Sequence, residues 1–367
     1  MNLFSSLDKV YTKEQLSARN AQRLAEFIAF GPMVFQVSRI MIKFGILDLL
    51  RDSNNGLGLN RTEIVEKTGL SDYAVKVLTD ASLTIGTILL DTETNRFSIS
   101  KTGWFLLNDP ATRVNIDFNQ DVNYEGLFHL EESLKNGKPE GLKHFGDWAT
   151  VYEGLSQLPE QVQKSWFAFD HFYSDNAFEE ALKIVFSSKV KTLLDVGGNT
   201  GRWAMRCVNY DKNVQVTIMD LPQQLEMMRK AVSEIDGSDR IDGFAIDLLN
   251  QDSSFPTNKH WDAIWMSQFL DCFGEDEIVS ILRRAKESMS ADTQLYIMET
   301  FWDRQKYEPA AFCLTQISLY FTTIANGNSK MYHSEDMQQM IEKSGLCVTS
   351  IHDYLGQGHS IMVCKLK

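Results

Sequence analysis

The stretch KTLLDVGGNTG, residues 191–201, decides the fold of this chain. Its first half is an apolar run of strand composition, and it passes directly into a glycine-rich turn. The residues after the turn, 202–207, can open a helix. Because glycine permits backbone conformations and close approaches that side chains prevent, a ligand can lie against the bare backbone of such a turn. The stretch therefore predicts an α/β domain that binds a ligand at its first strand–turn–helix unit.

Two well-known glycine motifs do not fit this turn. The dinucleotide pattern GxGxxG needs glycines at relative positions 1, 3 and 6, but Asn199 and Arg202 follow Gly197 at positions 3 and 6. The P-loop pattern fails because its closing Gly-Lys-Ser/Thr is missing. What fits is an acidic residue followed by alternating glycines, with Asn199 in the middle slot. Asparagine is the non-glycine residue that best tolerates a left-handed backbone, and an acidic strand end suits a cationic amino-acid ligand better than a pyrophosphate.

The rest of the back half alternates strands and helices, which is typical of a parallel sheet. Further strands are predicted over residues 214–219, 241–246, 262–266 and 294–298, and a closing hairpin over 345–354 and 358–366. Ligands bind at the carboxyl ends of parallel strands. Acidic residues stand at or just after five such ends in order: Asp195, Asp220, Asp247, Asp271 and Glu299. The second of them, Asp220, is placed to accept hydrogen bonds from ribose hydroxyls.

The front half has a different pattern. Residues 1–50 are predicted to be helical throughout, with a break or kink at Gly31-Pro32. The apolar run 41–50 suits a core or a dimer interface equally well. Residues 59–107 predict two helices and two short strands, which is a winged-helix pattern. Asn60, with Glu63 three residues on, is expected to cap the first helix, Gly69 to end it, and Ser71 to cap the second. Its second helix offers Lys76 as its one basic side chain, beside Asp72 and Asp80, so packing is favoured over DNA binding.

The totals narrow the class of protein. A formal net charge of −13 over 367 residues disfavours nucleic acids and anionic membrane surfaces as partners. The five cysteines show no CxxC spacing, which indicates neither a disulfide framework nor a zinc site and fits the cytoplasm. Neither a signal peptide nor a run of 18 apolar residues is visible. Since no HExxH-like set of metal ligands occurs, no metal is expected.

Taken together, these motifs resemble the family of small-molecule O-methyltransferases that includes caffeate-type, hydroxyindole and bacterial polyketide-tailoring enzymes. The stretch 194–201 resembles the family's glycine-rich cofactor motif, and Met219-Asp220-Leu221-Pro222 its Phe-Asp-Leu-Pro ribose motif. Residues 246–249, with Asp247 and Leu248, resemble the segment that contacts adenine. The resemblance implies S-adenosylmethionine as cofactor, a small hydroxylated and aromatic or polyketide-like acceptor, and a homodimer formed through residues 31–50.

The resemblance also implies an architecture and a cofactor site. The fold class is α/β, a Rossmann-like methyltransferase domain over 186–367, preceded by an α-helical winged-helix-like dimerisation domain over 1–108 and a helical connecting segment over 109–185. The cofactor-binding residues are expected to be Asp195, Gly197, Gly198, Gly201, Asp220, Leu221, Asp247, Leu248 and Ser267.

The expected acid–base set departs from the family pattern. The family's catalytic His-Asp-Trp is Asp271-Cys272-Phe273 here, a lysine that commonly precedes it is Ser267, and Lys330 stands in the segment of a later supporting glutamate. The glutamate after the fifth strand survives as Glu299. Phe169-Asp170 stands where the family often has Phe-Asn near the acceptor.

A phenol has a pKa of about 10, so its hydroxyl needs help to lose a proton near neutral pH. Asp271 is the hypothetical base, because apolar neighbours could desolvate it and raise its pKa. The alternatives are that Asp271 caps the next helix or binds cofactor, and that His171 or His333 is the base. Two further possibilities for the chain are a cofactor-binding protein without transfer activity and a winged-helix regulator that senses the cofactor.

Overall fold

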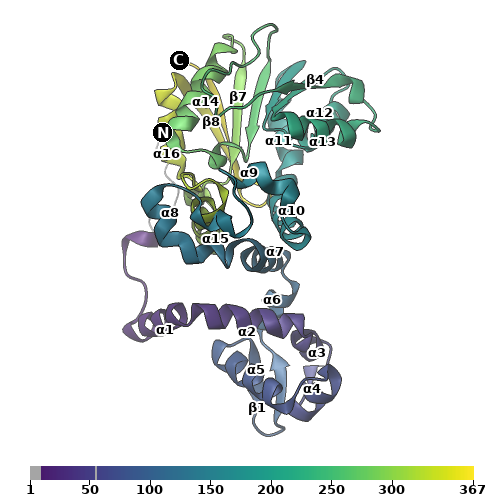
Figure 1. Cartoon of the computed structure of the whole chain (residues 1–367), viewed down its shortest axis with the longest axis vertical. Helices are drawn as coiled ribbons and strands as arrows, with labels where there is room; N and C mark the ends of the chain where they lie inside the picture. The colour runs from purple at the N-terminus through teal and green to yellow at the C-terminus, as the bar shows by residue number, and fades with distance from the viewer. Residues whose placement is uncertain (1–9, 54–55) are drawn as a thin grey trace. The chain divides into compact units, whose positions relative to one another are not determined.

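The computed structural model describes residues 10–53 and 56–367, and its contacts divide the chain into two units. The front unit is Glu14–Asp121, and the back unit is Val122–Lys367 together with the N-terminal residues up to Lys13. Figure 1 shows the elements of both units in chain order. The predicted three-part division at residues 108 and 185 stays a prediction.

The front unit consists of helices and one two-stranded sheet. Its helices are α1 (Ala18–Ala29), α2 (Gly31–Lys43), α3 (Ile46–Arg51), α4 (Arg61–Thr68), α5 (Asp72–Ile85), α6 (Lys101–Asn108) and α7 (Pro110–Phe118). Its strands are β1 (Ile88–Asp91) and β2 (Arg96–Ile99), which pair antiparallel. The apolar run predicted as core or interface is largely core, because Met41, Ile46, Leu47 and Leu50 are buried in the unit's hydrophobic cluster.

The prediction that residues 1–50 are helical throughout is wrong for residues 13–17, which are not helical. The Ser17 side chain ends this gap by accepting the Asn20 N–H at 3.3 Å and so capping α1. Residues 1–9 lie outside the described residues. The predicted break at Gly31-Pro32 is confirmed, because α1 and α2 meet at 73°.

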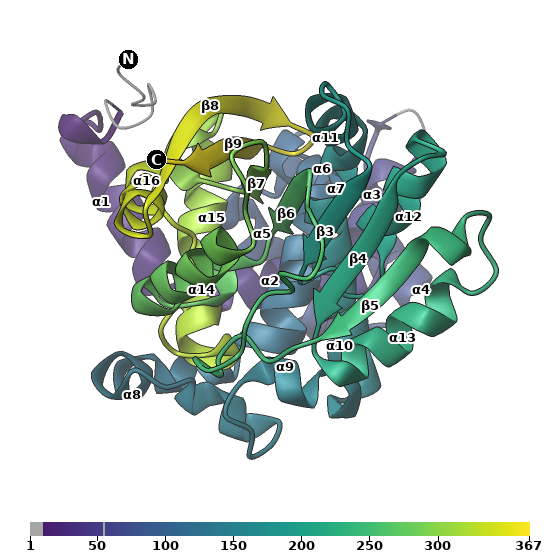
Figure 2. The same ribbon diagram turned by 90° about the horizontal axis from the view of Figure 1, so that it is seen from above.

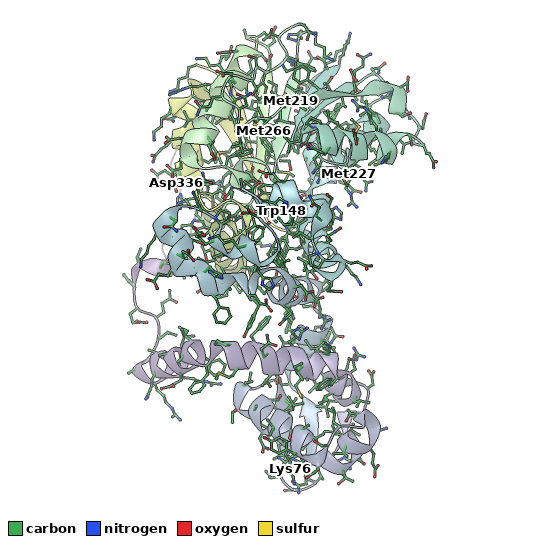
Figure 3. The ribbon with its side chains drawn as sticks, in the orientation of Figure 1. Lys76, Trp148, Met219, Met227, Met266 and Asp336 are labelled. Atoms are coloured by element: carbon green, nitrogen blue, oxygen red, sulfur yellow. The ribbon has the colours of Figure 1, made fainter. Side chains whose placement is uncertain are left out.

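The winged-helix prediction is confirmed in its details. Asn60 and Glu63 form a capping box at the start of α4, Gly69 ends that helix in a left-handed conformation, and Ser71 caps α5. Lys76, labelled in Figure 3, pairs with Asp72 at 2.5 Å. This ion pair reduces the positive charge that α5 can offer to a phosphate.

The back unit is built on a sheet of seven strands in the order β5-β4-β3-β6-β7-β9-β8. Strands β3 to β7 are parallel, and β9 pairs antiparallel with β7 and with β8 (Figure 2). The bounds are β3 (Thr192–Val196), β4 (Gln215–Asp220), β5 (Ile241–Ala245), β6 (Ala263–Ser267), β7 (Gln294–Glu299), β8 (Leu346–Leu355) and β9 (His359–Leu366). The predicted parallel sheet and its edge hairpin are therefore confirmed.

Helices cover both faces of this sheet. Apolar side chains of α11 (Phe178–Val185), α12 (Arg202–Tyr210) and α13 (Pro222–Val232) pack on one face. Those of α14 (Glu275–Glu287) and α16 (Ser334–Lys343) pack on the other, where Met219 and Met266 lie (Figure 3). Helices bury both faces of the sheet. The parallel strands are therefore held in one register, and their carboxyl ends lie along one edge.

The remaining elements are short helices and helical turns between these helices and strands. They are η3 (Asn119–Asn123), η4 (Gly126–His129), α8 (Leu130–Asn136), η5 (Glu140–His144), α9 (Val151–Gly154), η6 (Leu155–Gln157), α10 (Glu160–Ser174), η7 (Asp175–Ala177), η8 (Ser238–Arg240), η9 (Leu270–Cys272), η10 (Trp302–Arg304), α15 (Glu308–Tyr320) and η11 (Phe321–Ala325). In the part of the chain that the structure describes, no single helix is long and apolar enough to cross a membrane, although the bent pair α1–α2 has the length and composition to do so.

Candidate active site

The turn after β3 has the conformation that its composition predicts. Gly197 and Gly201 have φ values of +73° and +82°, and Asn199 is left-handed at φ +49°. The role predicted for Asn199, a left-handed residue in a glycine slot, is therefore confirmed. A Cβ atom on Gly197 would lie 2.3 Å from Cδ2 of Phe269, so glycine is required there by both backbone and space.

Asp195, at the end of β3, lies beneath this turn. Its side chain is buried, and Oδ2 has no hydrogen-bond partner among the described residues. A Cβ atom on Gly198 would lie 2.6 Å from that oxygen, so the carboxylate is in contact with the bare backbone. Burial, and then the charge of Asp220, raise the pKa of Asp195 to about 8. An unpartnered buried carboxylate of this kind is stabilised when a cationic ligand binds beside it.

Asp220 joins the first turn to the second. Its Oδ2 accepts the Asn199 N–H at 2.8 Å, and its Oδ1 accepts the Leu221 N–H at 2.7 Å. Burial raises the pKa of Asp220, and the two backbone hydrogen bonds oppose that rise. The carboxylate thus holds both turns at the carboxyl edge, where a ribose would lie in a fold of this type.

The other predicted cofactor residues lie at the ends of neighbouring strands. Asp247, just beyond β5, is exposed, and its Oδ1 accepts the Leu249 N–H at 2.9 Å. Leu248 is buried, and Ser267 is the last residue of β6. Because β5, β4, β3 and β6 are adjacent and parallel, these residues share one edge of the sheet with Asp195 and Asp220.

Asp271 and Glu299 form a buried pair of carboxyl groups at the same edge. Asp271 lies in η9 after β6, and Glu299 ends β7; both side chains are buried. Burial raises the pKa of Asp271 to about 6, while hydrogen bonds from Cys272 oppose the rise. Burial, and then the charge of Asp271, raise the pKa of Glu299 well above its usual range. Glu299 is therefore the carboxyl of the pair that keeps its proton most firmly.

Hydrogen bonds hold residues 269–273, the Asp271 segment, to Glu299. Glu299 Oε1 accepts the N–H groups of Phe269 and Leu270 at 3.1 and 2.9 Å. The Cys272 thiol donates to Asp271 Oδ1 at 3.5 Å. The alternative that Asp271 caps the next helix is wrong, because Gly274 is the N-cap of α14.

The two histidine candidates differ in their surroundings. His333 Nδ1 accepts the Glu335 N–H at 3.0 Å at the start of α16, and Nε2 lies 3.7 Å from Asp303 Oδ2. A ring held this way serves as a helix cap, so the structure favours a structural role for His333. His171 lies on α10 with its ring 5.9 Å from that of Phe167.

Aromatic side chains lie near Asp271. The Trp166 indole N–H donates to the Tyr320 hydroxyl at 2.7 Å. Burial raises the pKa of Tyr320, and the charges of Cys272, Asp170 and Asp271 add to the rise. The Asp170 position and the Asp271 segment therefore face the same part of α15. The Tyr152 hydroxyl lies near the Cys272 side chain, next to Asp271. Burial, and then Cys272, raise the pKa of this hydroxyl.

Several site residues were not predicted from the sequence. Gln268 has φ +45°, which is unusual for a residue with a side chain, and its buried Oε1 has no partner among the described residues. Asn326 and Tyr332 donate hydrogen bonds to the backbone of residues 272 and 273. Lys330, noted in the same segment, instead pairs with Asp336 at 3.4 Å and is about half exposed. Single polar residues such as Gln268, Asn326 and Tyr332 are too common in sequences for their types alone to indicate these roles.

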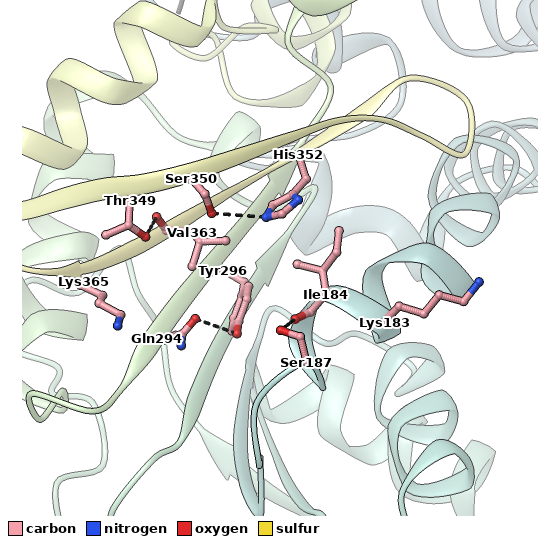
Figure 4. Close-up of a pocket in the computed structure, with 10 residues that line it drawn as sticks. All are labelled: Lys183, Ile184, Ser187, Gln294, Tyr296, Thr349, Ser350, His352, Val363 and Lys365. Atoms are coloured by element: carbon pink, nitrogen blue, oxygen red, sulfur yellow. Dashed lines mark hydrogen bonds between the residues drawn. The ribbon is translucent and has the colours of Figure 1, made fainter. Parts of the chain in front are cut away.

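A separate cavity of about 410 Å³ lies beside the first half of β7 (Figure 4). It is lined by the start of β7, by α11 and by the closing hairpin, including Gln294, Tyr296 and His352. It is therefore not part of the carboxyl-edge site. Within residues 10–53 and 56–367, no group of three or more His, Cys, Asp or Glu side chains could hold a metal ion.

The sheet order, the glycine turn and the row of acidic strand ends define a Rossmann-like methyltransferase. A model of the O-methyltransferase domain matches residues 129–346, which is more than half of the chain, and a Dimerisation2-like domain model matches residues 22–97. The chain belongs to the O-methyltransferase domain family, and it is an S-adenosylmethionine-dependent O-methyltransferase.

Individual relatives are distant. The protein is 23% identical to the L-tyrosine C(3)-methyltransferase of Streptomyces lavendulae over 87% of its own length and 85% of the relative's. It is 21% identical to the mitomycin biosynthesis 6-O-methyltransferase of the same organism, over 89% and 90% of the two sequences. The apo structure of the S-adenosylmethionine-dependent methyltransferase SibL aligns with a TM-score of 0.68 at 20% identity, over 93% of this protein and 98% of that one.

Proposed function

We propose that this enzyme methylates a phenolic hydroxyl of a small aromatic or polyketide-like acceptor, with Asp271 as the base. The observation that carries the proposal is the carboxyl group of Asp271, buried at the carboxyl edge with a pKa raised to about 6. A base with that pKa is mostly ionised near neutral pH and is a stronger proton acceptor than an ordinary aspartate.

The cofactor residues of the proposal follow from the carboxyl edge. Asp195 would face the cationic amino-acid part of S-adenosylmethionine, since its Oδ2 is buried without a partner in the described part of the protein. Gly197, Gly198 and Gly201 keep the backbone bare beneath the ligand. Ribose would meet Asp220 and Leu221, adenine would meet Asp247 and Leu248, and Ser267 would border the sulfonium end.

Bound S-adenosylmethionine would supply an electrophilic methyl group to the acceptor oxygen. In the proposed step the acceptor O–H bond breaks and Asp271 receives the proton, while the O–C bond forms and the C–S bond breaks. Glu299 holds the Asp271 segment through the N–H groups of Phe269 and Leu270. Much of the rate then comes from alignment of the two reactants.

An aromatic acceptor is supported by the rings of Trp166 and Tyr320 and by the hydroxyl of Tyr152 near Asp271. Flat ligands stack well on such rings. Relatives at 21–23% identity are named for tyrosine and for mitomycin biosynthesis, and both names fit small aromatic or natural-product acceptors. His171 remains the other candidate to contact the acceptor's hydroxyl from α10.

The proposal is tested with S-adenosylmethionine carrying a ¹³C methyl group and a panel of phenols that includes tyrosine. We expect the label to appear as a methyl ether, identified by its carbon chemical shift. A phenolate is also reactive at its ortho carbon, so label on a ring carbon would keep Asp271 as base but overturn O-methylation. Tight cofactor binding with no transfer to any phenol would instead overturn the phenolic acceptor.

We propose that the enzyme is a homodimer formed through its front unit. Support comes from the Dimerisation2-like match and from the exposed apolar side chains of α1 and α2, namely Leu24, Ile28 and Met33. Burying such side chains against a second copy stabilises a dimer. Light scattering should give twice the single-protomer mass of 41.9 kDa. A single-protomer mass at micromolar concentration would contradict the dimer.

We also place the enzyme in the cytoplasm. All five cysteines lie in the described part of the protein and are free thiols. Free thiols on buried and half-buried sites persist most readily in a reducing compartment.

A further inference from the structure

We infer that Tyr332 and Asn326 are positioning residues that hold Asp271 in place for proton abstraction. The inference rests on the proposed role of Asp271 as base. It concerns the residues that directly follow Asp271, whereas Glu299 accepts hydrogen bonds from Phe269 and Leu270 before it.

Both residues bind the backbone directly after Asp271. The Tyr332 hydroxyl donates to the Phe273 carbonyl at 2.6 Å, and the Asn326 side-chain amide donates to the Cys272 carbonyl at 2.5 Å. Glu299 binds the backbone on the other side, at Phe269 and Leu270. The carboxylate of Asp271 is thus held between anchors one or two residues away on each side.

The two donors are themselves rigid. The Tyr332 ring is buried in the hydrophobic cluster that also contains Leu270 and Phe301. The Asn326 Oδ1 accepts from the Ser329 N–H at 3.2 Å and from its hydroxyl at 3.0 Å. A donor that is held in this way fixes the position of the carbonyl that it binds, and it adds to the hydrogen bonds that the Cys272 and Phe273 N–H groups make to Phe269 and Leu270 at 3.1 Å.

Residues 326–332, which include both donors, also explain how the site compensates for its departure from the family pattern. Lys330 lies between Asn326 and Tyr332 but pairs with Asp336 at the surface. The segment's contribution to the site is therefore two neutral donors to the backbone, rather than a charge beside Asp271. Neutral donors leave the carboxylate able to accept a proton, whereas a cation beside it would lower its pKa.

The test compares Tyr332→Phe with a matched control, Tyr296→Phe. Tyr296 is also a buried tyrosine of the same unit, its hydroxyl donates to Gln294 at 3.0 Å, and its ring packs in the hydrophobic cluster on the other face of the sheet. We expect Tyr332→Phe to lower kcat about 10-fold with an unchanged Kd for S-adenosylmethionine, because small displacements of a reacting group are costly. Tyr296→Phe should leave kcat unchanged.

A double-mutant cycle with Asp271→Asn separates positioning from a general structural effect. If Tyr332 acts through Asp271, Tyr332→Phe should have little further effect on kcat in the Asp271→Asn background. In Tyr332→Phe alone, the acidic limb of the kcat profile should move to lower pH, because a loosened segment admits water and removes part of the burial that raises the pKa of Asp271. Asn326→Ala should behave in the same way.

Three results would overturn the inference: an unchanged kcat in both Tyr332→Phe and Asn326→Ala, equal losses with and without Asp271, or a loss that Tyr296→Phe reproduces. An unchanged kcat in Asp271→Asn itself would instead refute the proposed base. The two failures are therefore distinguishable.

Discussion

Replacing Asp271 by asparagine is expected to lower kcat about 100-fold or more, a range typical of removing a general base. Asparagine keeps the shape of the side chain but cannot accept the acceptor's proton. Since the predicted cofactor contacts come from other strand ends, the Kd for S-adenosylmethionine should change little. Single-turnover methyl transfer to a phenol, measured beside calorimetric titration of the cofactor, gives both quantities.

The matched control for this variant is Asp252→Asn. Asp252 is an exposed aspartate in the connection between β5 and β6, so its replacement should leave both turnover and affinity unchanged. Asp271→Asn turnover within about twofold of the wild-type enzyme would remove Asp271 from the mechanism, and His171 would become the first residue to test.

Replacing Gly197 by alanine is expected to weaken S-adenosylmethionine binding about 100-fold. The residue has φ +73°, and the new Cβ atom would lie 2.3 Å from Phe269 Cδ2. To relieve that contact, either the cofactor turn or the ring of Phe269, two residues before Asp271, must move. Isothermal titration calorimetry with S-adenosylmethionine measures the effect directly.

Gly69→Ala is the matched control for backbone strain. Gly69 has φ +70° but nothing within 4 Å of the added Cβ atom. It should lower the free energy of unfolding by about 1 kcal/mol without changing cofactor affinity. Equal cofactor affinity in Gly197→Ala and the wild-type enzyme would show that the cofactor does not lie on this turn.

Local patterns were enough to predict the sheet and the cofactor turn. The apolar run ending in Asp195 and the glycine-rich turn after it are contiguous in sequence, so their geometry follows from the residues themselves. The capping residues Asn60 and Ser71 act over three residues, and their helices begin where predicted. Features of this range depend little on the rest of the protein.

The surroundings of Asp271 could be predicted only in part. The apolar residues next to it, Phe269 and Leu270, indicated burial and a raised pKa. Its anchors Asn326 and Tyr332 follow it by 55 and 61 positions and act through hydrogen bonds to backbone carbonyls, which no side-chain pattern encodes. Residues 13–17 were predicted as helix because nothing in their composition outweighs the pattern around them, yet the Ser17 cap decides the boundary.

The most direct test of the account is the pH dependence of single-turnover methyl transfer at saturating S-adenosylmethionine. A base must be ionised, so the rate should fall as pH falls through about 6, the value to which burial raises the pKa of Asp271. Saturating cofactor removes the titration of Asp195, whose pKa is raised to about 8 in the free enzyme. We expect this acidic limb in the wild-type enzyme and its absence in Asp271→Asn; the same limb in both would contradict Asp271 as the base.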